Sequence, residues 1–122
     1  MTGMNLSVRE INDGALFEIA GRLMHESDSH LFHDKLNEEL KKGKKWFVLD
    51  LSGVIGLSST GLGILIAAHR TIQDCGGSFR LAQLSDKVRT ILQITRLNGI
   101  FEIFDNVEEA VKQSKKTVVQ IQ

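Results

Sequence analysis

The sequence predicts an α/β protein with a mixed, mostly parallel β-sheet and helices packed against it. Segments with the apolar pattern of strands alternate with segments of helical period, after an opening hairpin. Residues 44–52, KKWFVLDLS, contain apolar side chains on consecutive positions rather than alternating ones, which is typical of a strand covered on both faces. Serines and glycines stand between these segments, where helices are expected to begin and end.

The opening hairpin is expected over residues 5–11 and 15–20. The first segment, NLSVREI, alternates apolar and polar side chains, and the second, ALFEIA, follows an Asn-Asp-Gly turn signal at 12–14. Because glycine weakens a strand, we expect Gly21 to end the second one.

A first helix is expected after this hairpin. Ser27 or Ser29 can cap its start, since a serine oxygen accepts a hydrogen bond from a free amide of the first turn. Lys41 and Lys42 suit the last turn, and Gly43 suits the stop. The side chains expected on its inner face are Leu31, Phe32, Leu36 and Leu40.

Residues 44–52, KKWFVLDLS, are expected to form the central strand. The chain then passes Gly53 and enters a helix over 61–77, GLGILIAAHRTIQDCGG, indicated by its length and its double-glycine end. The side chains that fall near one another at helical spacing are Leu62, Leu65, Ile66, His69 and Ile72.

The remaining segments continue the alternation of strand and helix. We expect a strand over 78–84, a helix over 86–97 capped by Ser85 and ended by Asn98-Gly99, a strand over 100–104 and a helix over 105–116. The inner residues of these two helices are expected to be Val88, Ile91, Leu92, Leu97, Val107, Ala110 and Val111.

Composition limits the classes of function. A chain of 122 residues has the size of one domain, and we expect a single domain over 1–122, with its core at about 4–113 and a C-terminal tail at 114–122. The 15 basic and 15 acidic residues give a formal net charge of zero. No global field would therefore hold the protein on nucleic acid or on an anionic membrane.

Cysteine use and apolar runs point to the cytoplasm. Cys75 is the single cysteine and is interpreted as a packing residue. The N-terminus lacks a secretion-signal pattern. No apolar run approaches the roughly 20 residues that cross a bilayer. We expect a soluble cytoplasmic protein with no nucleic-acid partner, no direct membrane insertion, no cofactor and no metal. The basic cluster of Lys41, Lys42, Lys44 and Lys45 is interpreted as solubility and charge matching at a helix end.

The stretch LSSTGLG, residues 57–63, is the strongest candidate site. Its three hydroxyl residues lie where a central strand leads into a helix, a crossing that exposes side chains at the carboxyl edge of α/β sheets. Helix capping explains such residues equally well. No Glu or Gln follows any of them by three residues, so the positive helix end is ready for an anion. Gly61 and Gly63 weaken a helix, which favours close approach of another backbone.

Other chemistries fit this stretch poorly. It lacks the lysine of a phosphate-binding P-loop and the full dinucleotide fingerprint. A nucleophilic serine needs a base, and no spacing ties any of the four histidines to Ser59. His30, His33 and Asp34 permit a metal site, but no cysteine or glutamate completes the set, so we prefer a solvated helix face.

The order of the motifs resembles the STAS domain over nearly the whole chain. After the hairpin come GRL, VLDLSGV, SSTGLG, GGSFRLAQL and RLNGIFEIF, in the order and spacing of that family. The chain is most similar to the anti-anti-sigma factors, which are bacterial anti-sigma factor antagonists. Each motif alone is weak, but the ordered set is specific.

This resemblance implies a switch controlled by phosphorylation. In its unphosphorylated form such a protein binds an anti-sigma factor, which is itself a serine kinase, and a sigma factor is released. The kinase phosphorylates a hydroxyl that corresponds to Ser59, with Thr60 as the second choice, and a phosphatase of the metal-dependent serine/threonine class restores it. The partner-binding residues that the resemblance implies are Met24, His25, Ser58, Thr60, Gly61 and Leu62.

Two positions depart from the family's pattern. Ser58 stands where an Asp usually precedes the phosphoacceptor, and Met24 stands where the turn GELD or GRLD ends in Asp. Both changes make the face less acidic, so we expect a different or unusually selective anti-sigma partner, or a form that binds without being phosphorylated. The alternative function implied by the resemblance is a STAS subunit that docks on the cytoplasmic ATPase of a membrane transporter.

Overall fold

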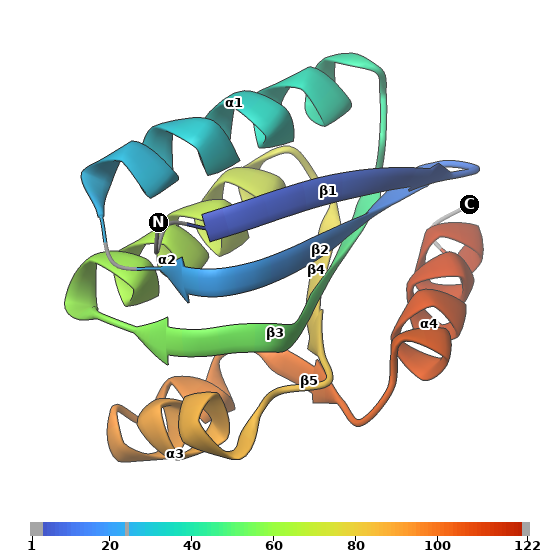
Figure 1. The fold of residues 1–122 in the computed structure, drawn as a ribbon. Coiled ribbons are helices and arrows are strands. Elements are labelled where there is room, and N and C mark those ends of the chain that lie inside the picture. Colours follow the sequence, from blue (N-terminus) through green and yellow to red (C-terminus); the bar gives the residue numbers. More distant parts are fainter. Residues whose placement is uncertain (1–3, 24, 121–122) are drawn as a thin grey trace.

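The computed structural model describes residues 4–23 and 25–120. Their elements are, in chain order, β1 (Met4–Ile11), β2 (Gly14–Leu23), α1 (Glu26–Lys41), β3 (Trp46–Leu57), α2 (Ser59–Asp74), β4 (Ser78–Ala82), α3 (Asp86–Ile94), the short 3-10 helix η1 (Leu97–Gly99), β5 (Glu102–Phe104) and α4 (Val107–Gln120). The strands form a sheet in the order β1-β2-β3-β4-β5 (Figure 1). β1 pairs with β2 in antiparallel register, and the neighbours from β2 to β5 are parallel. The predicted fold class, with its opening hairpin and its central strand, is confirmed.

The first half of β3 is buried on both faces. Phe47 and Leu49 belong to a large apolar cluster into which α1, α2 and α3 pack, whereas Trp46 and Val48 belong to a smaller cluster that α4 covers. In Figure 1, α4 stands well apart from α1 and α2. The consecutive apolar residues of this strand follow from the two layers, because adjacent side chains in a strand point to opposite faces.

α2 rests on the sheet through one face. Its buried residues are Gly61, Ile64, Leu65, Ala68 and Ile72. Leu62 is half-buried against the large cluster, and the ring of His69 lies 5.8 Å from that of Phe79 and 5.5 Å from that of Phe101. Ile66, which shares the helical spacing of these residues, is 41% exposed.

β2 continues past the residue that was expected to end it. Gly21 has a φ of +93°, and the strand runs on to Leu23. The pairing with β3 shifts at this point, from Gly21 opposite Val54 to Arg22 opposite Gly56. A glycine with positive φ at a β-bulge allows the ladder to resume beyond it.

The start of α1 also differs from the expectation. Its N-cap is His25 rather than Ser27 or Ser29. The Asp28 carboxylate accepts a hydrogen bond from the His25 amide at 3.1 Å and another from the Met4 amide at 3.4 Å. Asp28 is buried, and it fixes the helix start to β1, which the spacing of serines did not reveal. The end of α1 agrees with the sequence, because Gly43 follows it with a φ of +86°.

Three further expectations are corrected. α3 ends at Ile94 rather than at Asn98-Gly99, because Arg96 adopts a left-handed conformation with a φ of +62°. Cys75 is exposed and is not a packing residue. Leu31 is 42% exposed on α1 and faces away from the core, where Phe32 and Leu36 are fully buried.

Candidate functional site

Ser59 is the first residue of α2, two residues earlier than the sequence pattern placed the helix. β3 ends at Leu57, and Ser58 keeps an extended conformation with φ −94° and ψ 178° before the helix begins. Ser59 and Thr60 are exposed, and Ser58 is half-buried. The two candidate acceptors therefore lie on the surface at the carboxyl end of the central strand.

Ser58 caps this helix. Its Oγ accepts a hydrogen bond from the Gly61 amide at 3.2 Å, and its carbonyl oxygen accepts one from the Leu62 amide at 2.9 Å. Capping therefore explains Ser58, and it leaves the hydroxyls of Ser59 and Thr60 outside the cap.

The start of α2 has an unneutralised positive end. Its first turn contains no acidic side chain, and its cap is an uncharged serine. The first amides of a helix have no partner within the helix, and they carry the positive end of its dipole. An anionic group on Ser59 would therefore meet a favourable field and free donors.

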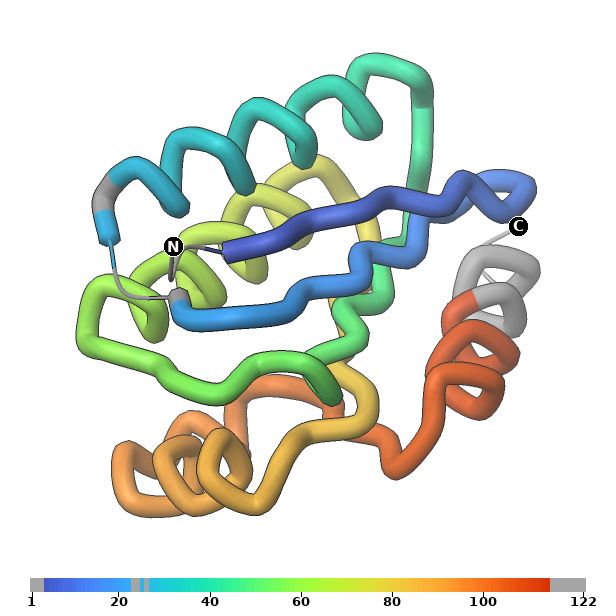
Figure 2. The backbone as a smooth tube through the Cα atoms, in the orientation of Figure 1, coloured from blue at the N-terminus to red at the C-terminus, as the bar shows by residue number. Residues whose placement is uncertain are grey.

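The starts of α1 and α2 share one edge of the sheet. Leu23 and Leu57, the last residues of β2 and β3, are partners in the parallel ladder, and His25 and Ser59 each follow two residues later. Figure 2 shows both helix starts at the same end of the molecule.

The candidate partner-binding residues divide by exposure. His25, Ser59 and Thr60 are exposed, whereas Gly61 is buried and Leu62 is half-buried. Gly61 and Leu62 therefore pack beneath the exposed residues at this edge of the sheet. Met24 lies outside the described residues.

The structure does not place a histidine of the described residues as a base for Ser59 or as part of a metal site. Among residues 4–23 and 25–120 no histidine is hydrogen-bonded to the Ser59 hydroxyl, so nothing orients a base toward it. Within the same residues, no three His, Cys, Asp or Glu side chains gather closely enough to hold a metal ion, and His30 and Asp34 are exposed on α1.

The basic cluster ties the end of α1 to the hairpin. The Lys42 Nζ lies 2.7 Å from a Glu10 carboxylate oxygen and 3.2 Å from one of Glu39, and the Lys44 Nζ donates to the Asn12 carbonyl at 2.7 Å. The hydrogen bond from Lys42 lowers the pKa of Glu10, and the same bond raises the pKa of Lys42. These lysines therefore have a structural role beyond solubility.

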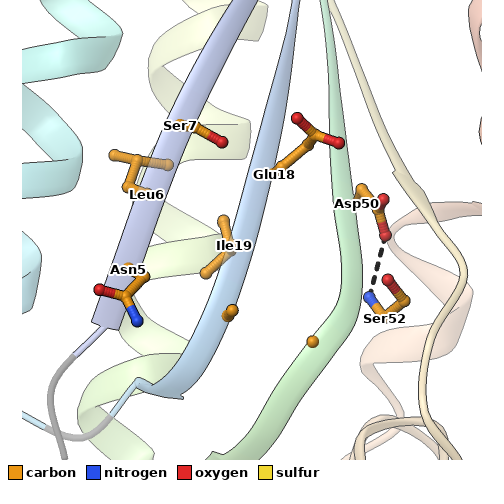
Figure 3. Close-up of a pocket in the computed structure, with 9 residues that line it drawn as sticks. Asn5, Leu6, Ser7, Glu18, Ile19, Asp50 and Ser52 are labelled. Atoms are coloured by element: carbon orange, nitrogen blue, oxygen red, sulfur yellow. Dashed lines mark hydrogen bonds between the residues drawn. The ribbon is translucent and has the colours of Figure 1, made fainter.

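A hollow of about 410 Å³ lies on the sheet face opposite to the one that α1 and α2 cover (Figure 3). Ser7, Glu18 and Asp50 stand side by side across β1, β2 and β3 in its lining. Asp50 Oδ1 accepts hydrogen bonds from the Ser52 amide at 3.0 Å and from the Gln83 side-chain amide at 3.2 Å. The candidate residues at the start of α2 do not line this hollow.

Comparison with known proteins identifies the fold family. The family model described as STAS domain matches residues 5–110. The chain belongs to the STAS domain family. A Thermotoga maritima protein provisionally named an anti-sigma factor antagonist is 29% identical over 108 residues, which cover 88% of this chain and 96% of that protein. The anti-sigma-B factor antagonist of Bacillus subtilis is 27% identical over 109 residues, covering 89% and 98%.

Solved structures agree with this assignment at the level of fold. The anti-sigma factor antagonist SpoIIAA in its unphosphorylated form has a TM-score of 0.78 at 18% identity, over 92% of this STAS chain and 97% of SpoIIAA. The phosphorylated form of SpoIIAA has a TM-score of 0.71 at 16% identity, over 89% and 98%. Within the described residues, no helix is both long and apolar enough to cross a membrane.

Proposed function

We propose that this STAS protein is an anti-sigma factor antagonist whose binding is controlled by phosphorylation of Ser59. In its unphosphorylated form it binds an anti-sigma factor with serine-kinase activity, and this binding frees a sigma factor in the cytoplasm. The phosphorylated form dissociates from the anti-sigma factor. A metal-dependent serine/threonine phosphatase then restores the unphosphorylated form. The observation that carries the proposal is the exposed Ser59 hydroxyl at the first position of a helix without acidic residues in its first turn.

The fold tolerates a phosphate at this position. Phosphorylation adds roughly −1.5 to −2 charges and three acceptor oxygens. The amides at the start of α2 supply donors, and its dipole supplies a favourable field. Because the side chain is already exposed, the modification breaks no core contact.

A partner that covers Ser59 does not tolerate the same group. Docking would strip water from a dianion, and such desolvation is costly unless the partner supplies matching cations. A tenfold loss of affinity needs about 1.4 kcal/mol, and reversing occupancy from 99:1 to 1:99 needs about 5.5 kcal/mol. The switch therefore acts through the interface rather than through a change of fold.

The uncharged cap, Ser58, affects how favourable a phosphate on Ser59 is. Ser58 performs the capping that an Asp would perform, without adding a charge. A unit negative charge about 6 Å from a doubly charged phosphate would repel it by about 1.4 kcal/mol in water. The neutral cap therefore favours the phosphorylated state of this chain relative to a chain with Asp at this position.

The proposal is tested by binding and by phosphorylation. The serine-kinase anti-sigma factors of the source organism are purified, and their affinities for wild-type, Ser59→Ala and Ser59→Asp are measured by calorimetry with ADP. We expect Ser59→Ala to bind within about threefold of wild type and Ser59→Asp to bind at least about tenfold more weakly. Thr60→Asp places the same charge one residue further along α2 and should weaken binding less.

With ATP in place of ADP, mass spectrometry should locate one phosphate on Ser59, and Ser59→Ala should remain unmodified. A phosphate on Thr60 would move the switch to that residue. Equal affinities of Ser59→Ala and Ser59→Asp would contradict the charge argument, and absence of binding to every such kinase would refute the function. Co-purification with transporter subunits instead would favour the transporter alternative.

A further inference from the structure

The sheet face opposite α1 and α2 changes character along β2 and β3. Where α4 packs against it, this face carries apolar side chains such as Leu16 and Val48. Two residues further along each strand, the same face carries Glu18 and Asp50, which line the hollow of about 410 Å³. Among the described residues, every one that lines this hollow belongs to β1, β2 or β3. The hollow is therefore a part of the sheet that these helices leave uncovered.

Small residues keep the middle of the hollow open. Ala20 and Gly53 are partners in the parallel ladder, and a Cβ built at Gly53 would lie 2.8 Å from the Ala20 Cβ. The close approach of the two strands therefore explains the glycine. Polar side chains border the open space, with Asn5 and Ser7 on β1 and Ser52 on β3 (Figure 3). The hollow thus offers hydrogen-bonding groups around a floor that has almost no side chains.

Two carboxylates stand side by side in the lining. Glu18 and Asp50 are direct partners in the ladder between β2 and β3, and neighbouring strands lie about 4.8 Å apart. Like charges on neighbouring strands repel each other. A sheet face that meets only water gains no stability from this arrangement. A cation bound between the two carboxylates would turn the repulsion into attraction.

The contacts of these carboxylates leave them open to a further cation. The Arg9 guanidinium lies 3.7 Å from a Glu18 carboxylate oxygen, but both side chains are largely exposed, and such surface pairs contribute little. The donors that Asp50 has within the described residues are uncharged, the Ser52 amide and the Gln83 side-chain amide. These bonds hold the Asp50 carboxylate in place without neutralising it.

The lining fits a guanidinium group better than a metal ion. Within the described residues, no three His, Cys, Asp or Glu side chains gather closely enough to hold a metal. A guanidinium is planar, has five N–H donors and pairs with carboxylates in a bidentate manner. Ser7, Glu18 and Asp50 form one row across three strands, so their oxygens can accept several of these donors together.

The open shape of the hollow favours an arginine of another protein over a free small molecule. Its lining comes from one face of three adjacent strands, so a bound group is covered from the sheet side alone (Figure 3). Sites for small molecules bury about 70–90% of the surface of their ligand. A protein segment that carries the arginine covers the outer side with its own chain.

We infer that this hollow is a docking site for an arginine side chain of a partner protein. The site is distinct from the edge that carries Ser59, because α2 packs on the opposite face of the sheet. Gly53 also precedes the end of β3 by four residues, which is about 13 Å along the strand. The inference does not depend on the proposed function, and it gives the protein a second interaction surface.

The test is a titration of isotope-labelled protein with a short capped peptide, followed by NMR. The peptide carries one central arginine between serine and threonine residues. A second peptide has citrulline in place of the arginine, which keeps the shape and removes the charge. A single arginine capped at both ends serves as the small-molecule probe. Circular dichroism confirms the fold of each protein variant.

The protein variants remove one charge at a time. Glu18→Gln and Asp50→Asn each remove a carboxylate from the hollow and keep the size of the side chain. Glu108→Gln is the matched control, because it removes the same charge from an exposed position on α4. Ser59→Asp tests whether the site is separate from the phosphorylation switch.

We expect the arginine peptide to shift the amide signals of the residues that line the hollow. Glu18→Gln and Asp50→Asn should each weaken its binding by about fivefold or more, and Glu108→Gln should stay within about twofold of wild type. Ser59→Asp should leave the affinity unchanged. Because no kinase enters this experiment, the proposed function can fail while the inference stands, and the reverse also holds.

Four results would overturn the inference. They are absence of shifts with the arginine peptide, equal binding of the citrulline peptide, an equal loss in Glu108→Gln, and loss of binding in Ser59→Asp. Binding of the capped single arginine as tightly as the peptide would assign the hollow to a small molecule and would also overturn the docking of a protein. If Asp50→Asn does not fold, Glu18→Gln decides alone.

Discussion

Two glycines near α2 are expected to respond to alanine with opposite signs. Gly63 lies inside the helix with open space where a Cβ would be, so Gly63→Ala should gain about 1 kcal/mol of helix propensity without a clash. For a chain of 122 residues, an unfolding entropy of about 2.1 cal/mol/K per residue converts this gain into a rise in Tm of about 4 °C.

Gly77 lies just beyond α2, ahead of β4, and has no such space. A Cβ there would lie 2.8 Å from the Lys45 carbonyl oxygen and 2.9 Å from Ile72 Cγ2. The Lys45 carbonyl accepts a hydrogen bond from the Ser78 amide at 2.9 Å, so it cannot move away freely. Overpacking of this kind costs about 1–3 kcal/mol, so Gly77→Ala should lower the Tm by about 4–12 °C.

The assay is thermal unfolding followed by circular dichroism, with urea titration to confirm that the m-value is unchanged. A lower Tm for Gly63→Ala would show that the helix face at Gly63 is crowded within the chain. A higher Tm for Gly77→Ala would show that the backbone around it relaxes at little cost.

Three further outcomes follow from the contacts. Ser58→Ala should lower the free energy of unfolding by about 1 kcal/mol, measured by urea titration, because the Gly61 amide loses its acceptor. Ser58→Asp should restore the wild-type stability. An unchanged unfolding midpoint for Ser58→Ala would refute the role of Ser58 as the cap. The pKa of Glu10 is lowered from 4.5 by its bond to Lys42, so its stabilisation is present above pH 4.5 and is lost as the pH falls through the lowered value. The free energy of unfolding, measured at a series of acidic pH values, should therefore depend less on pH in Glu10→Gln than in wild type. Identical pH profiles for the two proteins would contradict this. Leu65→Ala should cost about 2–5 kcal/mol, since Leu65 is fully buried; a loss under 1 kcal/mol would show that the site collapses around the cavity.

Local sequence signals predicted elements whose determinants lie within a few residues. The Asn-Asp-Gly turn defines the hairpin, Ser85 caps α3 by accepting a hydrogen bond from the Val88 amide at 3.3 Å, and Gly43 ends α1 with its positive φ. The consecutive apolar residues of β3 predicted a strand with cover on both faces, because only a central strand can bury both sets of side chains.

Expectations that depended on distant partners were less accurate. The sequence suggested serine caps for α1, but the N-cap is His25. The Asp28 carboxylate accepts the His25 amide and also the Met4 amide, 24 residues away. Helical spacing grouped Ile66 with Leu65 and Ile72, but the orientation of α2 on the sheet buries those two and leaves Ile66 41% exposed. Spacing gives the relative positions of side chains around a helix, but it does not say which side meets the sheet.

The sequence by itself determined the order of strands and helices, the hairpin and the presence of hydroxyl residues at the start of α2, because propensity, capping and turn chemistry act over a few residues. Only the tertiary structure decided which hydroxyl is the cap and which is exposed, and which face of α2 remains uncovered. It also brought His25 and Ser59 to one edge, through the pairing of Leu23 with Leu57. These features depend on how elements far apart in the chain pack together, and no short stretch of sequence contains that information.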